Sequence, residues 1–261
     1  MRISVAATAP FGADVLERLA ARHDVQTLLT RPDSPAGRGR KLAAPPAKQV
    51  AERLGIPVLQ PERPIGELEL PGDAVVVAAY GLLIPESLLV KRLWLNVHPS
   101  LLPRWRGAAP VERALLAGDA ETGVTIHETV KELDAGPIAA QRAFPLTAED
   151  DAGTVYARSA ELGADLLDEV LPKPTFAPQE GEPSYAAKIE AADRELDLSK
   201  AEESLNRIRA LSPHIGARGE LNGRRVTIWK ARLEDGRLVP LEVQPEGGKR
   251  MTYEAWRRGL R

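Results

Sequence analysis

Cysteine is absent from the 261 residues of this chain. The absence excludes disulfide bonds, thiolate metal ligands and a cysteine nucleophile, and it fits a reducing compartment. No apolar run reaches the roughly eighteen residues of a membrane span, so we expect no membrane association. The N-terminal residues enter a strand-like pattern directly, without the pattern of a signal peptide. We therefore expect a cytoplasmic protein.

Two nucleotide-binding motifs are also missing. No GxGxxG follows the first strand-like segment, and no GxxxxGK[ST] occurs anywhere in the chain. Neither a bound dinucleotide nor a P-loop nucleotide is therefore indicated. Any chemistry must come from side chains and not from a glycine-rich phosphate loop.

Short β-rich runs alternate with helical patterns over the first hundred residues. The nearly continuous apolar run at 73–78 is typical of a strand that is covered on both faces. The alternation predicts an α/β fold with a doubly wound, mostly parallel, Rossmann-like sheet, whose ligands bind at the carboxyl ends of the strands. We predict strands at 2–7, 25–29, 56–59, 73–78 and 93–98, and helices at 13–22 and 46–54.

The second half of the chain contains a change of character near Pro183. A long helix is predicted at 151–171, and the proline-rich stretch 172–183 is typical of a stiff linker. Beyond it we predict a helix at 201–210 and strands at 225–229 and 238–243. We therefore expect a catalytic domain at 1–183 and a smaller domain at 184–261.

Charge is unevenly distributed, although the formal net charge is only −2. Residues 207–261 contain 13 lysines and arginines against 6 aspartates and glutamates, a local balance of +7 that leaves −9 on the rest of the chain. A basic segment on an acidic body suits a polyanionic partner. A solvated basic surface explains the same pattern, and charge alone does not choose between the two.

Asn96 and His98 stand at the end of a predicted strand. Alternate residues of a strand share a face, so these two side chains point the same way while Leu95 and Val97 point into packing. Pro99 ends the strand, which places the pair at a carboxyl edge. A neutral imidazole can take a proton from an attacking amine, and an amide can donate to a developing oxyanion. The pair suits acyl transfer to an amine; a polar pair that only caps the strand is the alternative.

Asp134 precedes Ala-Gly-Pro, where an aspartate is a turn residue by default. A histidine acting as a base needs a carboxylate that orients it and stabilises its protonated form, and Asp134 could fill that role for His98. His127 alternates with Thr125 on another strand-like segment. It either lines the same site or is a satisfied histidine in the packing, and the residues alone favour the packing role.

Residues 96–110 read NVHPSLLPRWRGAAP and residues 133–137 read LDAGP. Together they resemble the active-site signature of the folate-dependent formyltransferases. The resemblance implies that Asn96, His98 and Asp134 are catalytic, that 10-formyltetrahydrofolate is the formyl donor, and that no metal is required. The folate contacts that it implies are Ser100, Leu101, Leu102, Pro103, Tyr80, Leu82 and Ile84.

Residues 31–42 (RPDSPAGRGRKL) resemble the loop that methionyl-tRNA formyltransferases insert against the tRNA acceptor end. Its glycines and prolines predict a loop without regular structure, and its cations can bind phosphates. The segments 184–189, 207–213 and 244–251 resemble the basic C-terminal domain of that family, a β-barrel of the oligonucleotide-binding (OB) type that binds tRNA. The tRNA contacts predicted from these segments are Arg38, Arg40, Lys41, Arg207, Arg209, Lys249 and Arg250.

The chain departs from the family between Arg232 and Arg237, where four residues replace additional strands of the barrel. We therefore expect a small OB-like barrel that is shortened or incomplete. The combined prediction is a monomeric enzyme that transfers a formyl group from 10-formyltetrahydrofolate to the α-amino group of methionyl-initiator tRNA.

Two alternatives stay open. The first is an N-formyltransferase acting on an amino sugar nucleotide or another small amine; the basic loop argues against it and the shortened barrel argues for it. The second is a non-catalytic RNA-binding protein, which is less favoured because binding alone requires none of Asn96, His98 and Asp134.

Overall fold

The computed structural model describes residues 1–36, 41–63 and 68–260. The chain divides into two compact units, each assembled from several stretches of sequence. The first unit comprises 1–106, 123–143 and 157–184, and the second comprises 107–122, 144–156 and 185–261. The long segment of the second unit thus begins at Tyr185, beside the predicted domain start at 184, and the two shorter stretches join it from within the predicted catalytic domain.

A seven-stranded sheet organises the first unit. Its strands are β1 (Arg2–Ala7), β2 (Asp24–Leu29), β5 (Val58–Leu59), β6 (Ala74–Ala78), β7 (Leu93–His98), β9 (Glu121–Glu128) and β10 (Ile138–Pro145). They follow the order β10-β9-β7-β6-β1-β2-β5. The pairs β1–β2, β1–β6, β6–β7 and β2–β5 are parallel, and β7–β9 is antiparallel. The predicted mostly parallel, Rossmann-like sheet is confirmed.

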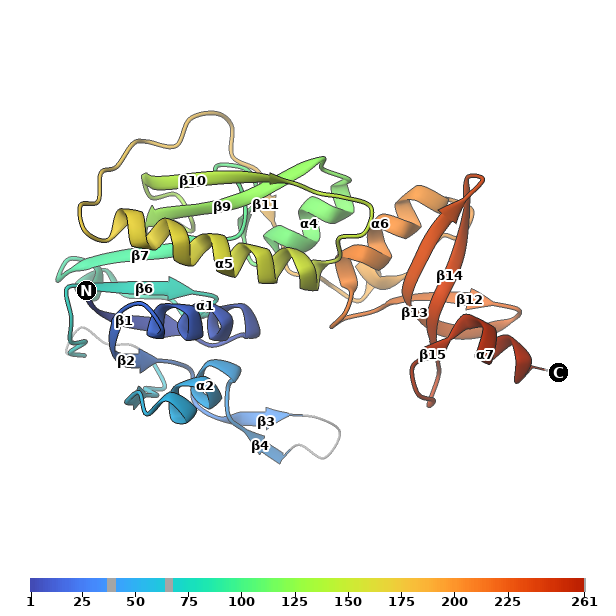
Figure 1. Cartoon of the computed structure of the whole chain (residues 1–261), viewed down its shortest axis with the longest axis horizontal. Coiled ribbons are helices and arrows are strands. Elements are labelled where there is room, and N and C mark those ends of the chain that lie inside the picture. The colour runs from blue at the N-terminus through green and yellow to red at the C-terminus, as the bar shows by residue number, and fades with distance from the viewer. Residues whose placement is uncertain (37–40, 64–67, 261) are drawn as a thin grey trace. The chain divides into compact units, whose positions relative to one another are not determined.

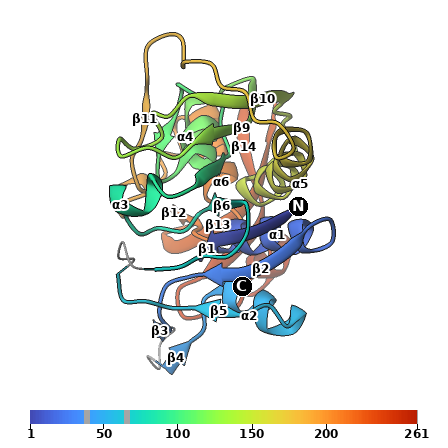
Figure 2. The ribbon, with the colours of Figure 1, turned by 90° about the vertical axis from the view of Figure 1, so that its left-hand side faces the viewer.

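Helices cover the sheet, as Figure 1 shows for α1 (Pro10–Ala20), α2 (Pro46–Leu54) and α5 (Ala152–Val170). Figure 2 shows α1 and α5 on the same side of the central strands. α2 lies at its predicted bounds because Pro46 opens its first turn and Gly55 ends it in the left-handed conformation, at φ 70°. None of the helices in the described part of the chain has the length and apolar character needed to cross a membrane.

The apolar core lies on both faces of the middle strands. All five residues of β6 are buried, as the sequence predicted for a strand covered on both sides. On one face, Trp94 and Tyr80 pack in a buried cluster with Val75 and Val77. On the face toward α5, Gly163 allows close approach, since a Cβ there would lie 2.5 Å from Val97 Cγ1. Overpacking of this kind typically costs about 1–3 kcal/mol.

An antiparallel sheet dominates the second unit, in the order β12-β13-β14-β15. Its strands are β12 (Ala217–Leu221), β13 (Arg224–Glu234), β14 (Arg237–Pro245) and β15 (Met251–Thr252). The helices of this unit include α4 (Pro110–Ala117), α6 (Ala201–Leu211) and α7 (Tyr253–Arg258). The β-rich C-terminal part that the sequence predicted is thus confirmed, and its strands pair antiparallel.

The chain makes a tight turn between Arg232 and Arg237, where the family resemblance indicated a shortened barrel. Asp235 and Gly236 both have positive φ, at 49° and 73°, and connect β13 directly to β14. This combination suits a two-residue hairpin turn, whose twist matches that of the flanking strands. A hairpin therefore stands where the family resemblance led us to expect further strands.

The sequence predicted a loop without regular structure at 31–42, and the structure differs from this prediction on either side of residues 37–40. Ser34–Ala36 (β3) and Lys41–Ala43 (β4) pair as an antiparallel hairpin, which gives these residues regular structure despite the nearby prolines and glycines. The residues between them, 37–40, lie outside the described part of the chain.

Candidate active site

Asn96 and His98 occupy the end of β7, with Val97 between them directed against the Gly163 region of α5. Because side chains alternate along a strand, Asn96 and His98 face away from that helix. Both stand at the carboxyl edge of the parallel strands, where this class of sheet binds its ligands. The positions that the sequence predicted for the two residues are confirmed, and their catalytic role stays a prediction.

His98 is held in one tautomer by the backbone. Its Nε2 lies 2.9 Å from the carbonyl oxygen of Trp105, which can only accept, so Nε2 carries a proton and donates it. The other ring nitrogen, Nδ1, lies 3.6 Å from Asp134 Oδ2. Burial lowers the pKa of His98 below its ordinary value, and the charge of Asp134 opposes that shift. His98 is thus a neutral base whose basic nitrogen is Nδ1.

Asp134 lies in the connection between β9 and β10 at φ 49°, a conformation that non-glycine residues rarely adopt. Gln179 holds this turn, because its Nε2 donates to the carbonyl oxygens of Asp134 and Gly136, each at 2.8 Å. Arg106 in turn donates to Gln179 Oε1. Gly136 is needed here, since a Cβ would fall onto the carbonyl oxygen of Glu128. These contacts maintain the strained turn.

Asn96 is bound to both of its polar neighbours. It is the register partner of His127 across the antiparallel β7–β9 pair. Its Nδ2 lies 3.1 Å from His127 Nε2 and 3.1 Å from Asp134 Oδ1. His127 is 1% exposed and its Nε2 lies 3.6 Å from Asp134 Oδ1. His127 is therefore buried and also belongs to the site, so the two interpretations left open by the sequence are both partly right.

The predicted folate-binding segment from Ser100 to Pro103 is fixed on β9. Thr125 Oγ1 donates to the carbonyl oxygen of Ser100 at 2.7 Å and accepts from the backbone nitrogen of Leu102 at 3.1 Å. Gln141 Nε2 donates to the carbonyl oxygen of Leu102 at 2.9 Å. Ser100 and Leu102 are buried, whereas Leu101 and Pro103 are half-buried. The segment is thus preformed beside His98.

The predicted pterin-pocket residues follow β6. Tyr80 is buried in the core cluster, where burial raises the pKa of its hydroxyl to about 12. Leu82 and Ile84 are partly buried against the same cluster. Leu83 between them is 85% exposed. Apolar side chains thus alternate between the core and solvent along this segment.

Among the predicted tRNA contacts, Arg38 and Arg40 lie outside the described residues. Lys41, the first residue of β4, is exposed. In the second unit, Lys249 is exposed. Arg250 donates to Glu242 Oε2 and lies over the ring of Trp229, 5.1 Å from its centroid.

Arg209 and Arg207 contact the backbone of the second unit. Arg209 donates to the carbonyl oxygens of Thr147 and Asp150 at 2.5 and 2.7 Å. Arg207 donates to the carbonyl oxygen of Glu195 at 2.6 Å. These arginines have structural partners, and their contribution to tRNA binding stays a prediction.

The only side chains in the described residues that together offer a metal-binding cluster are His98, His127 and Asp134. One ligand atom from each lies within 4.8 Å of the others. Asn96 Nδ2 already donates to two of these three groups. A cation would have to displace this amide, so the arrangement favours a hydrogen-bonded cluster.

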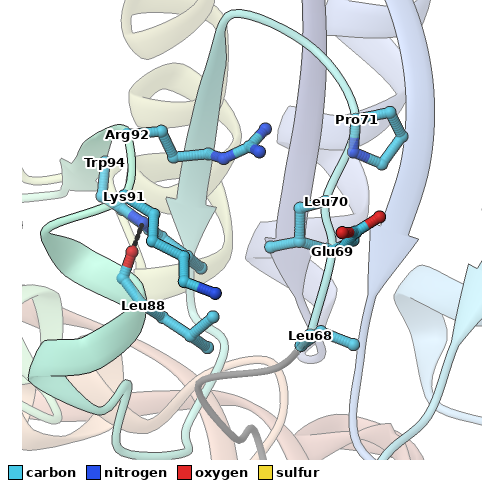
Figure 3. Close-up of a pocket in the computed structure, with 8 residues that line it drawn as sticks. All are labelled: Leu68, Glu69, Leu70, Pro71, Leu88, Lys91, Arg92 and Trp94. Atoms are coloured by element: carbon cyan, nitrogen blue, oxygen red, sulfur yellow. Dashed lines mark hydrogen bonds between the residues drawn. The ribbon is translucent and has the colours of Figure 1, made fainter.

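A cavity of about 570 Å³ opens at the opposite edge of the sheet. It is formed by the segment before β6 and the start of β7, as Figure 3 shows. The side chains that line it are Leu68, Glu69, Leu70, Pro71, Leu88, Lys91, Arg92 and Trp94. It lies at the amino ends of these strands and is therefore separate from His98.

Several residues of the site escaped the sequence prediction. Gln179 lies in the stretch interpreted as a linker, and Ser184 Oγ accepts from the backbone nitrogen of Trp105 at 2.9 Å. Both act on segments far away in sequence, and no local pattern marks such contacts. Thr125 could have been found, because it alternates with His127 on the strand facing the site.

Comparison with known proteins agrees with this geometry. The Formyl transferase family matches residues 1–171. The methionyl-tRNA formyltransferase of Dechloromonas aromatica (strain RCB) is 40% identical over 295 residues, which cover 99% of this chain and 96% of that protein. The solved methionyl-tRNA formyltransferase from Clostridium thermocellum has a TM-score of 0.64 at 17% identity, covering 94% of this chain and 98% of that chain.

HypX from Aquifex aeolicus, solved in complex with tetrahydrofolic acid, has a TM-score of 0.63 at 18% identity and covers 98% of this chain and 46% of that chain. At such identities the two solved structures show the shared fold alone. The family match and the close relative go further, and on these grounds the chain belongs to the formyl transferase family.

Proposed function

We propose that this protein transfers the formyl group of 10-formyltetrahydrofolate to the α-amino group of methionine esterified to initiator tRNA. The observation that carries the chemistry is the contact of His98 Nδ1 with Asp134 Oδ2 beside Asn96. The acceptor is supported by the 40% identical relative, which is named a methionyl-tRNA formyltransferase and whose length this chain nearly spans.

His98 acts as the base in the first step. The amine nitrogen attacks the formyl carbon, and the proton that it loses goes to Nδ1, because Nε2 already donates to Trp105. The imidazolium that forms is stabilised by Asp134, 3.6 Å from Nδ1. The negative charge moves onto the formyl oxygen, which becomes the oxyanion of a tetrahedral intermediate.

Asn96 supplies a donor for this oxyanion. In the resting site both of its amide hydrogens have partners, His127 Nε2 and Asp134 Oδ1. Protonation of His98 draws the Asp134 carboxylate toward the new positive charge and weakens its bond to Asn96. One amide hydrogen is thus released when the oxyanion appears. Loss of one such donor typically costs about two to three orders of magnitude in rate.

The intermediate then collapses. The oxyanion re-forms the carbonyl, the bond from carbon to N10 of the folate breaks, and the proton on His98 Nδ1 moves to N10. The products are formylmethionyl-tRNA and tetrahydrofolate, and His98 returns to its neutral state. Every proton removed from the amine is delivered to the leaving nitrogen, so the cycle requires no further reactant.

The predicted binding residues fall into two groups, one for the folate and one for the tRNA. Ser100, Leu101, Leu102, Pro103, Tyr80, Leu82 and Ile84 hold the folate. Arg38, Arg40 and Lys41 bind the acceptor end, and Arg207, Arg209, Lys249 and Arg250 contribute to binding elsewhere on the tRNA. Phosphate contacts of this kind make affinity fall with salt. We propose that the enzyme acts as a cytoplasmic monomer without a metal.

The decisive experiment measures transfer of labelled formyl from 10-formyltetrahydrofolate to methionyl-tRNA, with free methionine and an amino sugar nucleotide as parallel acceptors. We expect rapid formylation of the charged tRNA and loss of about two or more orders of magnitude in kcat in His98→Ala. Circular dichroism and retention on immobilised folate show whether that variant is folded. Formylation of the sugar in preference to the tRNA would overturn the acceptor, and formylation of neither would overturn the proposal.

A further inference from the structure

His127 faces Asn96 directly across the β7–β9 pair. Its ring is buried, and its two nitrogens have different neighbours. Nδ1 lies 2.9 Å from the carbonyl oxygen of Glu128, and Nε2 lies 3.1 Å from Asn96 Nδ2. A carbonyl oxygen can only accept a hydrogen bond, so the proton of the neutral ring resides on Nδ1. Nε2 therefore presents a lone pair to Asn96.

The orientation of the Asn96 amide follows from its two partners. An ionised Asp134 only accepts hydrogen bonds, and the lone pair of His127 Nε2 also accepts. Both partners require the amide nitrogen on their side, because the amide oxygen would meet two acceptors there. Asp134 alone would hold one hydrogen of Asn96, and His127 holds the other.

We infer that His127 is a positioning residue, which anchors the Asn96 amide while Asp134 releases it to the oxyanion. The inference rests on the proposed function, in which Asp134 turns toward protonated His98. At that moment Asp134 no longer fixes Asn96. The hydrogen bond to His127 keeps the amide nitrogen directed into the site, so the released hydrogen points at the oxyanion and not elsewhere.

The anchor depends on the charge of His127. A protonated His127 has N–H groups on both nitrogens and cannot accept from Asn96. The titratable groups that face it are Asp134, from the turn after β9, and His98, from β7, whose ring centroid lies 6.2 Å away. The anchor therefore requires that Nε2 of His127 carry a lone pair and not a proton.

The kinetic test compares His127→Leu with His127→Gln. Leucine fills the apolar volume without an acceptor, whereas glutamine places an amide oxygen near the position of Nε2. We expect His127→Leu to lower kcat roughly tenfold with little change in KM for the folate, as loss of one positioning hydrogen bond predicts. We expect His127→Gln to retain most of the rate. A normal kcat in a folded His127→Leu overturns the inference.

Recovery of the rate by glutamine is a readout that a purely structural role would not give, because leucine and glutamine both fill the position and only glutamine offers an acceptor to Asn96. Equal rates in the two folded variants contradict the anchor. Thermal unfolding of each variant identifies any loss of rate that comes from misfolding.

A measurement without turnover separates this inference from the proposed function. In ¹⁵N-labelled protein, the His127 ring should give the pattern of a neutral ring protonated at Nδ1, and the Asn96 side-chain amide should exchange slowly. We expect faster exchange in His127→Leu and protection in His127→Gln. An Nε2-protonated His127 overturns the inference whether or not methionyl-tRNA proves to be the acceptor.

Discussion

His98 and Asp134 approach each other through Nδ1 and Oδ2, 3.6 Å apart, while the opposite nitrogen of the same ring is bound to Trp105. The proton acceptor of the site is thereby the nitrogen nearest the carboxylate. Each proton that arrives is placed beside a negative charge, so the backbone carbonyl of Trp105 and the carboxylate of Asp134 together decide where the proton resides.

The activity of the enzyme should persist into mild acid. Burial lowers the pKa of His98 below its ordinary value near 6.5. His98 therefore stays neutral, and able to accept a proton, at pH values somewhat below 6.5. We expect the acid limb of kcat to have its midpoint below 6.5. Asp134→Asn removes the charge that raises this pKa, so the midpoint should move lower while the plateau falls roughly a hundredfold. A midpoint that moves upward would contradict this electrostatic account.

The same pKa shift affects stability. The folded state holds His98 neutral, so the unfolded state binds more protons as pH falls through its own value near 6.5. The free energy of unfolding should therefore decrease in that range, and His98→Gln should reduce the decrease. Urea titrations of both proteins between pH 5 and about 8 measure this contribution.

Gln179 should affect the reaction without touching substrate. Its side chain fixes the turn of Asp134, so Gln179→Ala frees that turn to leave its strained conformation. We expect kcat to fall roughly tenfold with KM for the folate nearly unchanged. Glu180→Ala, an exposed neighbour, is the matched control. Equal kinetics for the two variants would show that Asp134 is positioned by other contacts.

Two predicted tRNA contacts should behave differently on mutation. Arg209 donates to two backbone carbonyl oxygens in the second unit, so Arg209→Ala should lower Tm by several degrees. Lys249 is exposed, so Lys249→Ala should leave Tm unchanged and weaken tRNA binding in a salt-dependent manner. Melting curves and binding titrations at several salt concentrations distinguish these outcomes. A stable Arg209→Ala variant with weakened tRNA binding would assign Arg209 mainly to recognition.

A half-buried pair in the second unit, Tyr156 and Glu112, should contribute to stability. Tyr156 donates to Glu112 Oε2 at 2.8 Å, and burial raises the pKa of Glu112 despite this bond. Tyr156→Phe should lower the free energy of unfolding at pH 7 by about 1–3 kcal/mol, because the carboxylate loses its donor. The loss should shrink as the pH falls and Glu112 protonates, because its pKa lies above the ordinary value of a glutamate. A loss that is independent of pH would point to packing alone.

The sequence predicted the parts of the fold that carry strong local signals. Proline and glycine mark the ends of α2, and a continuous apolar run marks β6, so both lie near their predicted bounds. β10 was missed, because residues 138–145 contain few β-branched residues and are mostly half-exposed or exposed. α4 was missed because it has only eight residues and few large apolar ones.

The candidate site was predictable where chemistry and strand geometry agree. The alternation of side chains along β7 placed Asn96 and His98 on one face. A histidine that acts as a base needs a carboxylate partner, and this requirement indicated Asp134. The contact of His127 with Asn96 depends on antiparallel register between β7 and β9, which the sequence does not specify. The role of Gln179 also could not be predicted, because its contacts with Asp134 and Gly136 join residues that are distant in sequence.

The close approach of α5 at Gly163 divides the tolerance of β7 to mutation between its two faces. Val97 is limited by volume, since any enlargement must displace the helix. Asn96 and His98, on the other face, are limited by chemistry, and their replacement should spare the fold. Neighbouring positions of one short strand are thus limited in different ways: substitutions at Val97 change the packing of the scaffold, whereas substitutions at Asn96 and His98 change the reaction.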